Sequence, residues 1–248
     1  MRTWVFPMAG YGNRVKKRGL CKPLINIIDR PIFSWCLTGL LSIIDDNDII
    51  VVITTRYIED TFDLSEKIKG AFKIYNLDVD FRLVTVVKVP DGPACSIFKA
   101  REHYIKSNQT IVVNSDQFIQ FSFPTNNQLW DVFVPLYVNT TGQSSYAIIN
   151  NGKITKIKEK ILISNYASAG VYGFSNGELL VRCLAETLKG DPHRNNEYYI
   201  GPAINNLVIS GYRVVPVGVT VKYDLGSPNG IDLFTDFVKV MRNTHTKT

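Results

Sequence analysis

The sequence predicts an α/β fold, a doubly wound mixed sheet flanked by helices, within a single domain that spans residues 1–248. Three observations predict it. Short apolar runs alternate with longer segments of helical periodicity in the first half of the chain. The run at 48–54 is apolar almost throughout, which is typical of a parallel strand covered on both faces. A chain of 248 residues, 45% of them hydrophobic, can also bury one good core.

The first half of the chain, about residues 1–120, supplies the strands of the parallel part. Strands are expected at 3–6, 48–54, 79–87 and 110–116. Helices are expected between them at 31–44, 56–72 and 94–106. The first helix begins with proline, a residue favoured in the first turn. Strictly alternating strands and helices indicate a doubly wound sheet.

The second half, about residues 121–248, changes to short strands. These are expected at 132–138, 145–149, 154–157 and 166–174, followed by a later strand at 214–221. Asn150-Asn151-Gly152 between two of them is typical of a hairpin turn. Helices are expected at 176–188 and from 197 to about 211. A last amphipathic helix, with Phe234 and Val238 on its apolar face, is expected to pack on the sheet or on another subunit.

The composition limits the kinds of molecule that this protein is expected to bind. The net charge of +6 suits an anionic substrate but is too diffuse to indicate nucleic acid. No apolar run approaches the roughly 20 residues that span a bilayer, so no membrane partner is expected. The four cysteines have no C-x-x-C spacing, and no signal segment precedes the first strand, which fits the reducing cytoplasm.

The run after the first strand carries the strongest chemical signal. It contains Gly10 and Gly12, where a chain leaving a sheet can turn sharply and expose its amides. Five cations stand within the nine residues from Arg14 to Lys22, with no acid among them, so a triphosphate is the natural ligand. The glycines alone would fit an ordinary turn, and the three middle cations a solvated loop. Arg14 and Lys22 are therefore the predicted ligands.

A second signal is the carboxylate of Asp116 at the end of the strand at 110–116. An acid at the carboxyl end of a buried strand can hold Mg²⁺ over a neighbouring phosphate loop, because this hard cation takes oxygen ligands and keeps several waters. An Asx turn that ends the strand is the alternative.

The pattern Gly10-x-Gly12-x-Arg14, followed by Lys22-Pro23-Leu24, resembles the signature of the sugar-1-phosphate nucleotidylyltransferases, including those of capsule and polysaccharide pathways. The resemblance implies a Rossmann-like, GT-A-like fold. It also implies that Arg14 binds the leaving pyrophosphate and that Lys22 steadies the reacting phosphates. The nucleotide contacts that it implies are Met8, Ala9, Gly10, Gly12, Asn13, Gly92, Pro93, Ala94 and Ser115.

Two further segments resemble the family in the same chain order. Ser115-Asp116 is similar to its Gly-Asp pair, and residues 222–228 are similar to its aromatic-x-Asp-x-Gly-Thr-Pro motif. The resemblance implies that Asp116 and Asp224 hold Mg²⁺. From the residues alone, an exposed position in a Gly-Pro turn is the alternative for Asp224.

By the same resemblance, residues 1–120 form the nucleotide half and residues 121–248 the acceptor half. The implied acceptor contacts are Tyr146, Lys160, Asn165, Gly170 and Glu197. Lys160 would also suit a solvated position, and Glu197 would equally cap the helix that follows. Ile161 and Gly201-Pro202 depart from the family, which commonly has proline and Thr-Asp there.

The predicted activity is Mg²⁺-dependent condensation of an NTP with a sugar 1-phosphate or related phosphorylated small molecule, with release of pyrophosphate. No general base is required, because a phosphate monoester with a second pKa near ~6 is largely dianionic at neutral pH. Three alternatives stay open: a CTP-dependent cytidylyltransferase acting on a non-sugar phosphate, a glycosyltransferase that uses nucleotide sugars, and a non-catalytic nucleotide sensor. The nucleobase, the acceptor and the oligomeric state, a homo-oligomer included, are not decided by the sequence.

Overall fold

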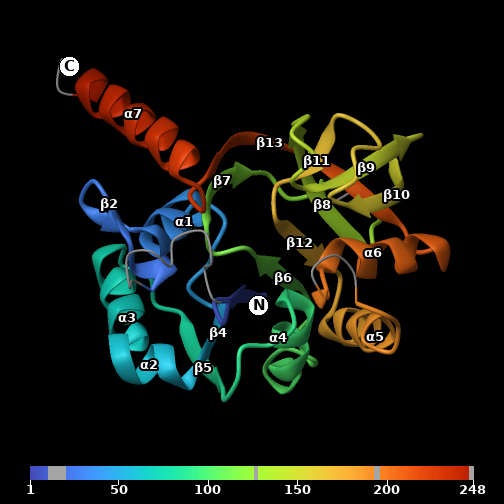
Figure 1. Cartoon of the computed structure of the whole chain (residues 1–248), viewed down its shortest axis with the longest axis horizontal. Helices are drawn as coiled ribbons and strands as arrows, with labels where there is room; N and C mark the ends of the chain where they lie inside the picture. Colours follow the sequence, from blue (N-terminus) through green and yellow to red (C-terminus); the bar gives the residue numbers. More distant parts are fainter. Residues whose placement is uncertain (11–20, 126–127, 193–195, 246–248) are drawn as a thin grey trace.

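The computed structural model describes residues 1–10, 21–125, 128–192 and 196–245, with side chains up to residue 243. Within these ranges, eleven strands form one mixed sheet with helices on both faces (Figure 1). The predicted fold class is confirmed. Among the described helices, none combines the length and the apolar character that crossing a membrane needs.

The first half of the chain, residues 1–120, has four parallel strands in the order β6-β1-β4-β5. They are β1 (Thr3–Pro7), β4 (Ile49–Thr55), β5 (Asp80–Val86) and β6 (Thr110–Val113). Strand β4 is buried along its whole length, as its apolar run predicts. The strands send alternate side chains to opposite faces: Val5 and Val51 belong to one core, and Phe6 and Val52 to the other.

The helices of this half cover the two faces unequally. They are α1 (Ile32–Leu40), α2 (Arg56–Phe62), α3 (Leu64–Ile74) and α4 (Pro93–Lys99). Helices α1 and α3 pack on the Phe6 side, whereas α4 packs on the Val5 side. Two short 3₁₀ turns, Lys22–Leu24 and Arg101–His103, complete the half.

The second half of the chain, residues 121–248, extends the sheet with strands that are mostly antiparallel. They are β8 (Val132–Val138), β9 (Ser145–Asn150), β10 (Lys153–Glu159), β11 (Tyr166–Ser168) and β12 (Val171–Phe174). Helices α5 (Gly177–Thr187) and α6 (Ile200–Ile209) pack on the same face as α4. The predicted hairpin joins β9 to β10, with left-handed φ angles of 49° at Asn151 and 72° at Gly152.

Several predicted elements are shorter in the structure. The strand expected at 110–116 ends at Val113, so Asp116 follows the strand instead of ending it. The helix expected at 56–72 is two helices, because Asp63 takes a left-handed φ of 48° between α2 and α3. The strand expected at 166–174 is divided into β11 and β12 at Gly170, where φ is 75°. The helices expected at 31–44 and 94–106 end after Leu40 and Lys99, and looser turns follow them.

Three strands were not predicted: β7 (Gln117–Phe121) and the short hairpin β2 (Asn26–Ile27) and β3 (Arg30–Pro31). Strand β7 matters most, because it pairs with the second part of β13 (Val214–Asp224). The first part of β13 runs parallel to β8 as far as the pair Gly218↔Leu136. After that point β13 continues antiparallel to β7 up to the pair Asp224↔Gln117, so it joins the two halves of the chain.

The last helix, α7 (Pro228–His245), projects at one corner of the molecule (Figure 1). Its apolar side covers a small hydrophobic cluster, here called the satellite core. The buried members of the satellite core are Ile25, Ile27, Ile32, Trp35, Phe118, Leu225, Phe234 and Val238. The helix therefore packs on this chain's own β2, β7, α1 and β13.

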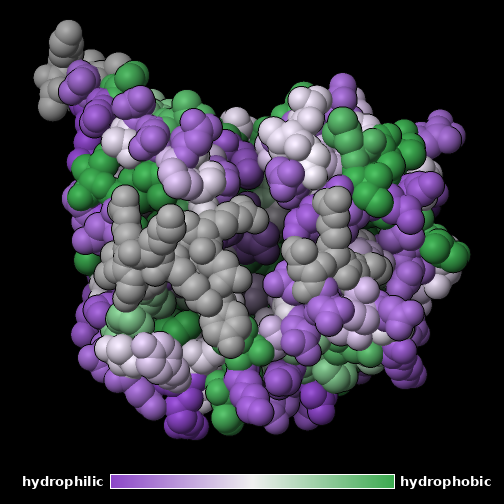
Figure 2. All heavy atoms as spheres, in the orientation of Figure 1, coloured by the Kyte–Doolittle hydropathy of each residue, from purple (hydrophilic) through white to green (hydrophobic). Residues whose placement is uncertain are grey.

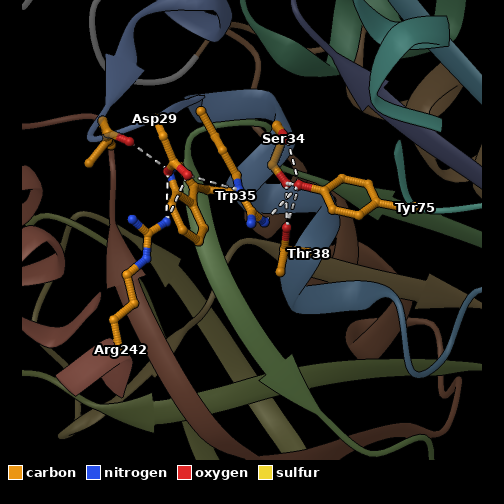
Figure 3. A network of polar contacts seen from close by, with 8 residues as sticks. Asp29, Ser34, Trp35, Thr38, Tyr75 and Arg242 are labelled. Carbon is orange, nitrogen blue, oxygen red and sulfur yellow. Dashed lines mark hydrogen bonds and ion pairs between the residues drawn. The ribbon is translucent and has the colours of Figure 1, made fainter. Parts of the chain in front are cut away.

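Polar contacts fix these elements further (Figure 3). The Tyr75 hydroxyl at the end of α3 lies 2.6 Å from Ser34 Oγ and 2.9 Å from Thr38 Oγ1, both on α1. At the other end of the network, Arg242 of α7 donates to both carboxylate oxygens of Asp29, at 2.9 and 2.8 Å. Helix α7 is thus tied to the turn between β2 and β3.

Candidate active site

Two adjoining hollows open where the parallel strands end, and their volumes are about 790 and 220 Å³. They share Pro93, Asn114 and Asp116 as lining residues. Figure 2 shows the surface hollowed near the middle of this face, with hydrophilic residues inside. The combined size and position are typical of a small-molecule site at the carboxyl edge of an α/β sheet.

The smaller hollow lies at the end of β1. Met8 and Gly10 line it, and the Met8 amide donates to the Ile53 carbonyl at 2.7 Å, which holds the chain beside β4 as it leaves the sheet. Ser115 lines the same hollow from the end of β6. Ala9 is buried in the core beneath it and does not line it. The predicted contacts Gly12, Asn13 and Arg14 lie outside the described residues.

Lys22 forms an ion pair with Asp116 between the two hollows. The lysine begins the 3₁₀ turn Lys22–Leu24, whose Pro23 is buried, so its backbone is held close to the sheet. Both side chains are partly exposed, 20% for Lys22 and 34% for Asp116, so a ligand can reach either charge. The structure therefore brings together one predicted catalytic cation and one predicted metal ligand, 94 residues apart in sequence.

Asp224 approaches the same point because of the pairing of β7 with β13. The register Asp224↔Gln117 places it beside Asp116, and the Leu225 amide donates to the Asp116 carbonyl at 2.8 Å. The Asp224 carboxylate also accepts from the Gly226 amide at 2.9 Å and from Ser227 Oγ at 2.7 Å. It is thus oriented by the turn that leads into α7.

Gly226 marks the point of convergence. A Cβ atom on it would lie 2.7 Å from Asp116 Oδ2, 2.7 Å from Lys22 Nζ and 3.1 Å from Asp224 Oδ1. Two carboxylates and an ammonium therefore face one small space that only a residue without a side chain leaves open. Such a space between two carboxylates fits a hard cation such as Mg²⁺, which uses few protein ligands and fills its other positions with water and substrate phosphates.

The donor set argues for this kind of ion over a zinc-like one. Across the part of the chain that the structure describes, no group of three or more His, Cys, Asp or Glu side chains is arranged to hold a metal. A structural or catalytic zinc site needs at least three such ligands. Asp116 and Asp224 are the carboxylates that face the space beside Gly226 and could hold a cation there.

The predicted nucleobase segment is joined to the predicted acceptor segment. The Tyr198 amide donates to the Asp91 carbonyl at 2.8 Å, and the Ala94 amide donates to the Tyr198 carbonyl at 3.0 Å. Gly92 takes a φ of 96°, and a Cβ there would lie 2.6 Å from the Tyr198 carbonyl oxygen. Ala94 is fully buried, whereas Pro93 lines both hollows.

Lys160, Glu197 and Gly170 line the larger hollow. Lys160 Nζ donates to the Tyr199 hydroxyl at 2.8 Å and lies 4.4 Å from the centre of its ring, and that hydroxyl in turn donates to Glu197. The Lys160 amide donates to the Ser144 carbonyl at 2.9 Å, at a left-handed φ of 52° that turns the chain at the end of β10. Lys160, Tyr199 and Glu197 therefore form one chain of hydrogen bonds in the lining of the hollow.

Tyr146 and Asn165 support the larger hollow from outside. Tyr146 is fully buried; its hydroxyl donates to Asn139 Oδ1 and accepts from the Gly142 amide, both at 2.7 Å. The exposed Asn165 accepts from the Asn139 amide at 3.0 Å through its carbonyl. Neither side chain lines the hollow. Both residues instead hydrogen-bond to Asn139, which lines it.

Several lining residues were not singled out from the sequence. They are Asn114, Gln117, Tyr137, Asn139, Glu159, Tyr172, Tyr199 and Lys222. Lys222 had a readable signal, because it stands two residues before Asp224 and so shares its face of a strand. Burial, with the nearby Glu159 carboxylate, raises the pKa of the Tyr172 phenol to about 12.

Comparison of the sequence with protein-family models and with curated proteins gives no match. Solved structures do match at the level of fold. The nucleoside-diphosphate-sugar pyrophosphorylase from Vibrio cholerae RC9 is 20% identical with a TM-score of 0.78, over 95% of this chain and 99% of that one. A UDP-glucose pyrophosphorylase complexed with UDP-glucose is 18% identical with a TM-score of 0.74, over 97% and 99%.

The inositol-1-phosphate CTP transferase from T. maritima is 19% identical with a TM-score of 0.70, over 93% of this chain and 91% of that one. All three likenesses extend over nearly the whole of both chains, so no large part of either fold is left unmatched. The chain has the fold of these pyrophosphorylases and nucleotidyltransferases.

Proposed function

We propose that the protein is a Mg²⁺-dependent nucleotidyltransferase. It condenses an NTP with a sugar 1-phosphate or a related phosphorylated small molecule and releases pyrophosphate. The observation that carries the proposal is the convergence of Asp116, Asp224 and Lys22 on the space beside Gly226, next to the hollow that Gly10 lines. The names of the fold's solved relatives, which include a UDP-glucose pyrophosphorylase and an inositol-1-phosphate CTP transferase, support it.

In the proposed reaction, a phosphate oxygen of the acceptor attacks the α-phosphorus of the NTP, and pyrophosphate leaves in line. The protein acts mainly by positioning its substrates and neutralising their charge. Mg²⁺ held by Asp116 and Asp224 would neutralise charge on the reacting phosphates. Lys22 adds a positive charge at the same point, and Lys160 orients the acceptor phosphate from the other side of the larger hollow. Arg14 keeps its sequence-based role as the pyrophosphate ligand.

The NTP would enter through the smaller hollow, with its base against Pro93, and the acceptor through the larger one. A CTP-dependent reaction on a non-sugar phosphate uses the same arrangement, so the choice of base and acceptor is left to the assay. A reaction that consumes NTP fits the cytoplasm. The four cysteines, all of which are unpaired thiols, fit the same reducing compartment.

The test is a pyrophosphate-release screen with Mg²⁺. It crosses the four ribonucleoside triphosphates and dTTP with sugar 1-phosphates and small phosphomonoesters. Release that needs one triphosphate together with one acceptor supports the proposal. Transfer from a nucleotide sugar without pyrophosphate release would point to a glycosyltransferase. Binding of a triphosphate without turnover on any acceptor would favour a sensor.

Substitution of either aspartate tests the metal site. Asp116→Asn and Asp224→Asn should each lower the rate of pyrophosphate release by about 10²–10³-fold, by analogy with the loss of one charge-stabilising group. Each variant should also need more Mg²⁺ for half its maximal rate. The matched control is Asp236→Asn. Asp236 is an exposed residue of α7 that does not line the hollow, so its substitution should change neither value. Full activity of both variants at limiting Mg²⁺ would exclude the assignment.

A further inference from the structure

We propose that Lys222 is a second cation of the acceptor pocket, and that the acceptor therefore carries an anionic group besides its reacting phosphate. That group is a carboxylate or a second phosphate. The inference rests on the proposed function and concerns the larger hollow, which Lys222 lines.

The strand places Lys222 on the same side as Asp224. Its neighbours Val221 and Tyr223 pack against the satellite core, and Tyr223 stacks on Phe237 of α7 with 4.9 Å between the ring centres. Because alternate residues of a strand face opposite ways, Lys222 and Asp224 both face away from α7, into the hollow. Two residues of strand separate them by about 7 Å, so Lys222 stands beside the metal site without belonging to it.

The Lys222 ammonium has a neutral partner. Its Nζ donates to the Tyr137 hydroxyl at 3.2 Å and lies 4.6 Å from the centre of that ring. The side chain is half-buried. Among the described residues, no carboxylate comes within the 4.0 Å ion-pair distance of Nζ, in contrast to Lys22, which is paired with Asp116. A partly desolvated charge that faces a hollow without a counter-ion favours an anion there.

The surroundings of Lys222 leave the hollow open to such an anion. Tyr137 brings the lysine next to Asn139 at the end of β8, and Thr141 and Gln143 follow on the loop that Tyr146 holds. These side chains are uncharged and can hydrogen-bond to acceptor hydroxyls. The four carboxylates that line the hollow have partners other than Lys222. Asp116 is paired with Lys22, and Glu159 accepts from Ser145 Oγ. Asp224 accepts from Gly226 and Ser227, and Glu197 accepts from Tyr199.

The arrangement separates two tasks within one pocket. Lys160, with Tyr199 and Glu197, stands on the β10 and α6 side, whereas Lys222 and Tyr137 stand where β13 leaves β8. A phosphorylated acceptor with one further negative group can contact both lysines. An acceptor without that group leaves Lys222 partly desolvated and without a counter-ion.

The test compares acceptors that differ only in the second charge. Glucose 1-phosphate is compared with glucuronic acid 1-phosphate and glucose 1,6-bisphosphate, and glycerol 3-phosphate with 3-phosphoglycerate. Binding is measured by calorimetry with Mg²⁺ and a non-hydrolysable NTP analogue, and KM and kcat by pyrophosphate release. Wild-type protein should bind the doubly anionic member of at least one pair about tenfold more tightly or better, as expected of a hydrogen bond to a charged group. The pair that shows the preference identifies a carboxylate or a phosphate.

Lys222→Met should abolish this preference, because the KM for doubly charged acceptors should rise about tenfold more than the KM for their singly charged partners, while Lys222→Arg should retain part of the preference. Lys156→Met, an exposed lysine of β10 that does not line the hollow, is the matched control and should keep the preference. Wild-type protein without a preference, or an equal loss of kcat for all acceptors in Lys222→Met, would overturn the proposal. Wild-type protein that binds with the preference but never releases pyrophosphate would overturn the proposed function alone.

Discussion

Gly226 shows how a single residue sets the candidate active site. Its backbone conformation does not require glycine, because its φ lies outside the left-handed range. Space requires it instead: a methyl group would lie 2.7 Å from both Asp116 Oδ2 and Lys22 Nζ. The residue is buried, and its amide also orients Asp224. One absent side chain thus keeps three charged groups close enough to share one ligand.

We expect Gly226→Ala to lower the rate of pyrophosphate release by about 100-fold, because a displacement of about 1 Å in a reacting group can cost that much. The control is Gly218→Ala in β13, where a Cβ would meet nothing within 4 Å. Steady-state rates at saturating Mg²⁺, with melting temperatures of both variants, make the comparison. Equal activity of the two variants would show that the space beside Gly226 is not used.

At the scale of elements, the satellite core holds the candidate site from behind. Lys22, Asp116 and Asp224 are followed within three residues by Ile25, Phe118 and Leu225, which are all buried in that core. Phe234 of α7 stands at its centre, with ring centres 5.1 Å from both Trp35 and Phe118. Helix α7 therefore acts on the site through packing, although only its first turns line the larger hollow.

Phe234→Ala should destabilise the protein by about 3–5 kcal/mol, the usual cost of removing a buried phenylalanine ring. It should also raise the Mg²⁺ concentration needed for half-maximal activity, because the two aspartates lose their common support. Leu184→Ala in α5, which is buried in a different core, should cost about 2–5 kcal/mol without that shift. Urea unfolding and Mg²⁺ titrations of both variants separate the two effects. An identical Mg²⁺ requirement in both would contradict the coupling.

At the scale of the whole molecule, one continuous sheet joins two halves with different strand order and direction, and β13 runs from one to the other (Figure 1). The larger hollow lies where β13 stops pairing with β8 and begins to pair with β7.

Folding also buries several thiols and phenols. Burial raises the pKa of Cys21 to about 11 and that of Tyr172 to about 12, and it raises the pKa of Cys36 and Cys183 as well.

These buried groups predict a loss of stability in alkali. The folded protein holds their protons more tightly than the unfolded chain, so unfolding releases protons once the pH exceeds the unfolded pKa. The free energy of unfolding should therefore fall as the pH rises from 9.0 towards about 11 for Cys21, and from 10.0 towards about 12 for Tyr172. Urea unfolding between neutral pH and pH 11 measures the decline. Cys21→Ser should reduce its slope, and a flat profile would contradict the prediction.

The sequence by itself determined the fold class and the chain positions of the principal charged groups. Local features carry this information: the unbroken apolar run of β4 shows a strand covered on both faces, and Asn150-Asn151-Gly152 shows a hairpin. Asp116 and Asp224 could be singled out because each stands at or just after the end of a strand within a recognisable pattern. Helix ends were less well predicted, because a single left-handed residue such as Asp63 interrupts a pattern that periodicity continues.

Only the tertiary structure decided which of these residues meet. The pairing of β7 with β13 joins segments about 100 residues apart, and no local periodicity encodes the register Asp224↔Gln117. That register brings the two aspartates to Lys22 and turns Lys222 into the larger hollow. The pairing of β9 with β10 and β11 in turn leaves Tyr146 buried. The physical reason is that sequence patterns report which face of a strand is buried, whereas the partner strand determines what each exposed face encounters.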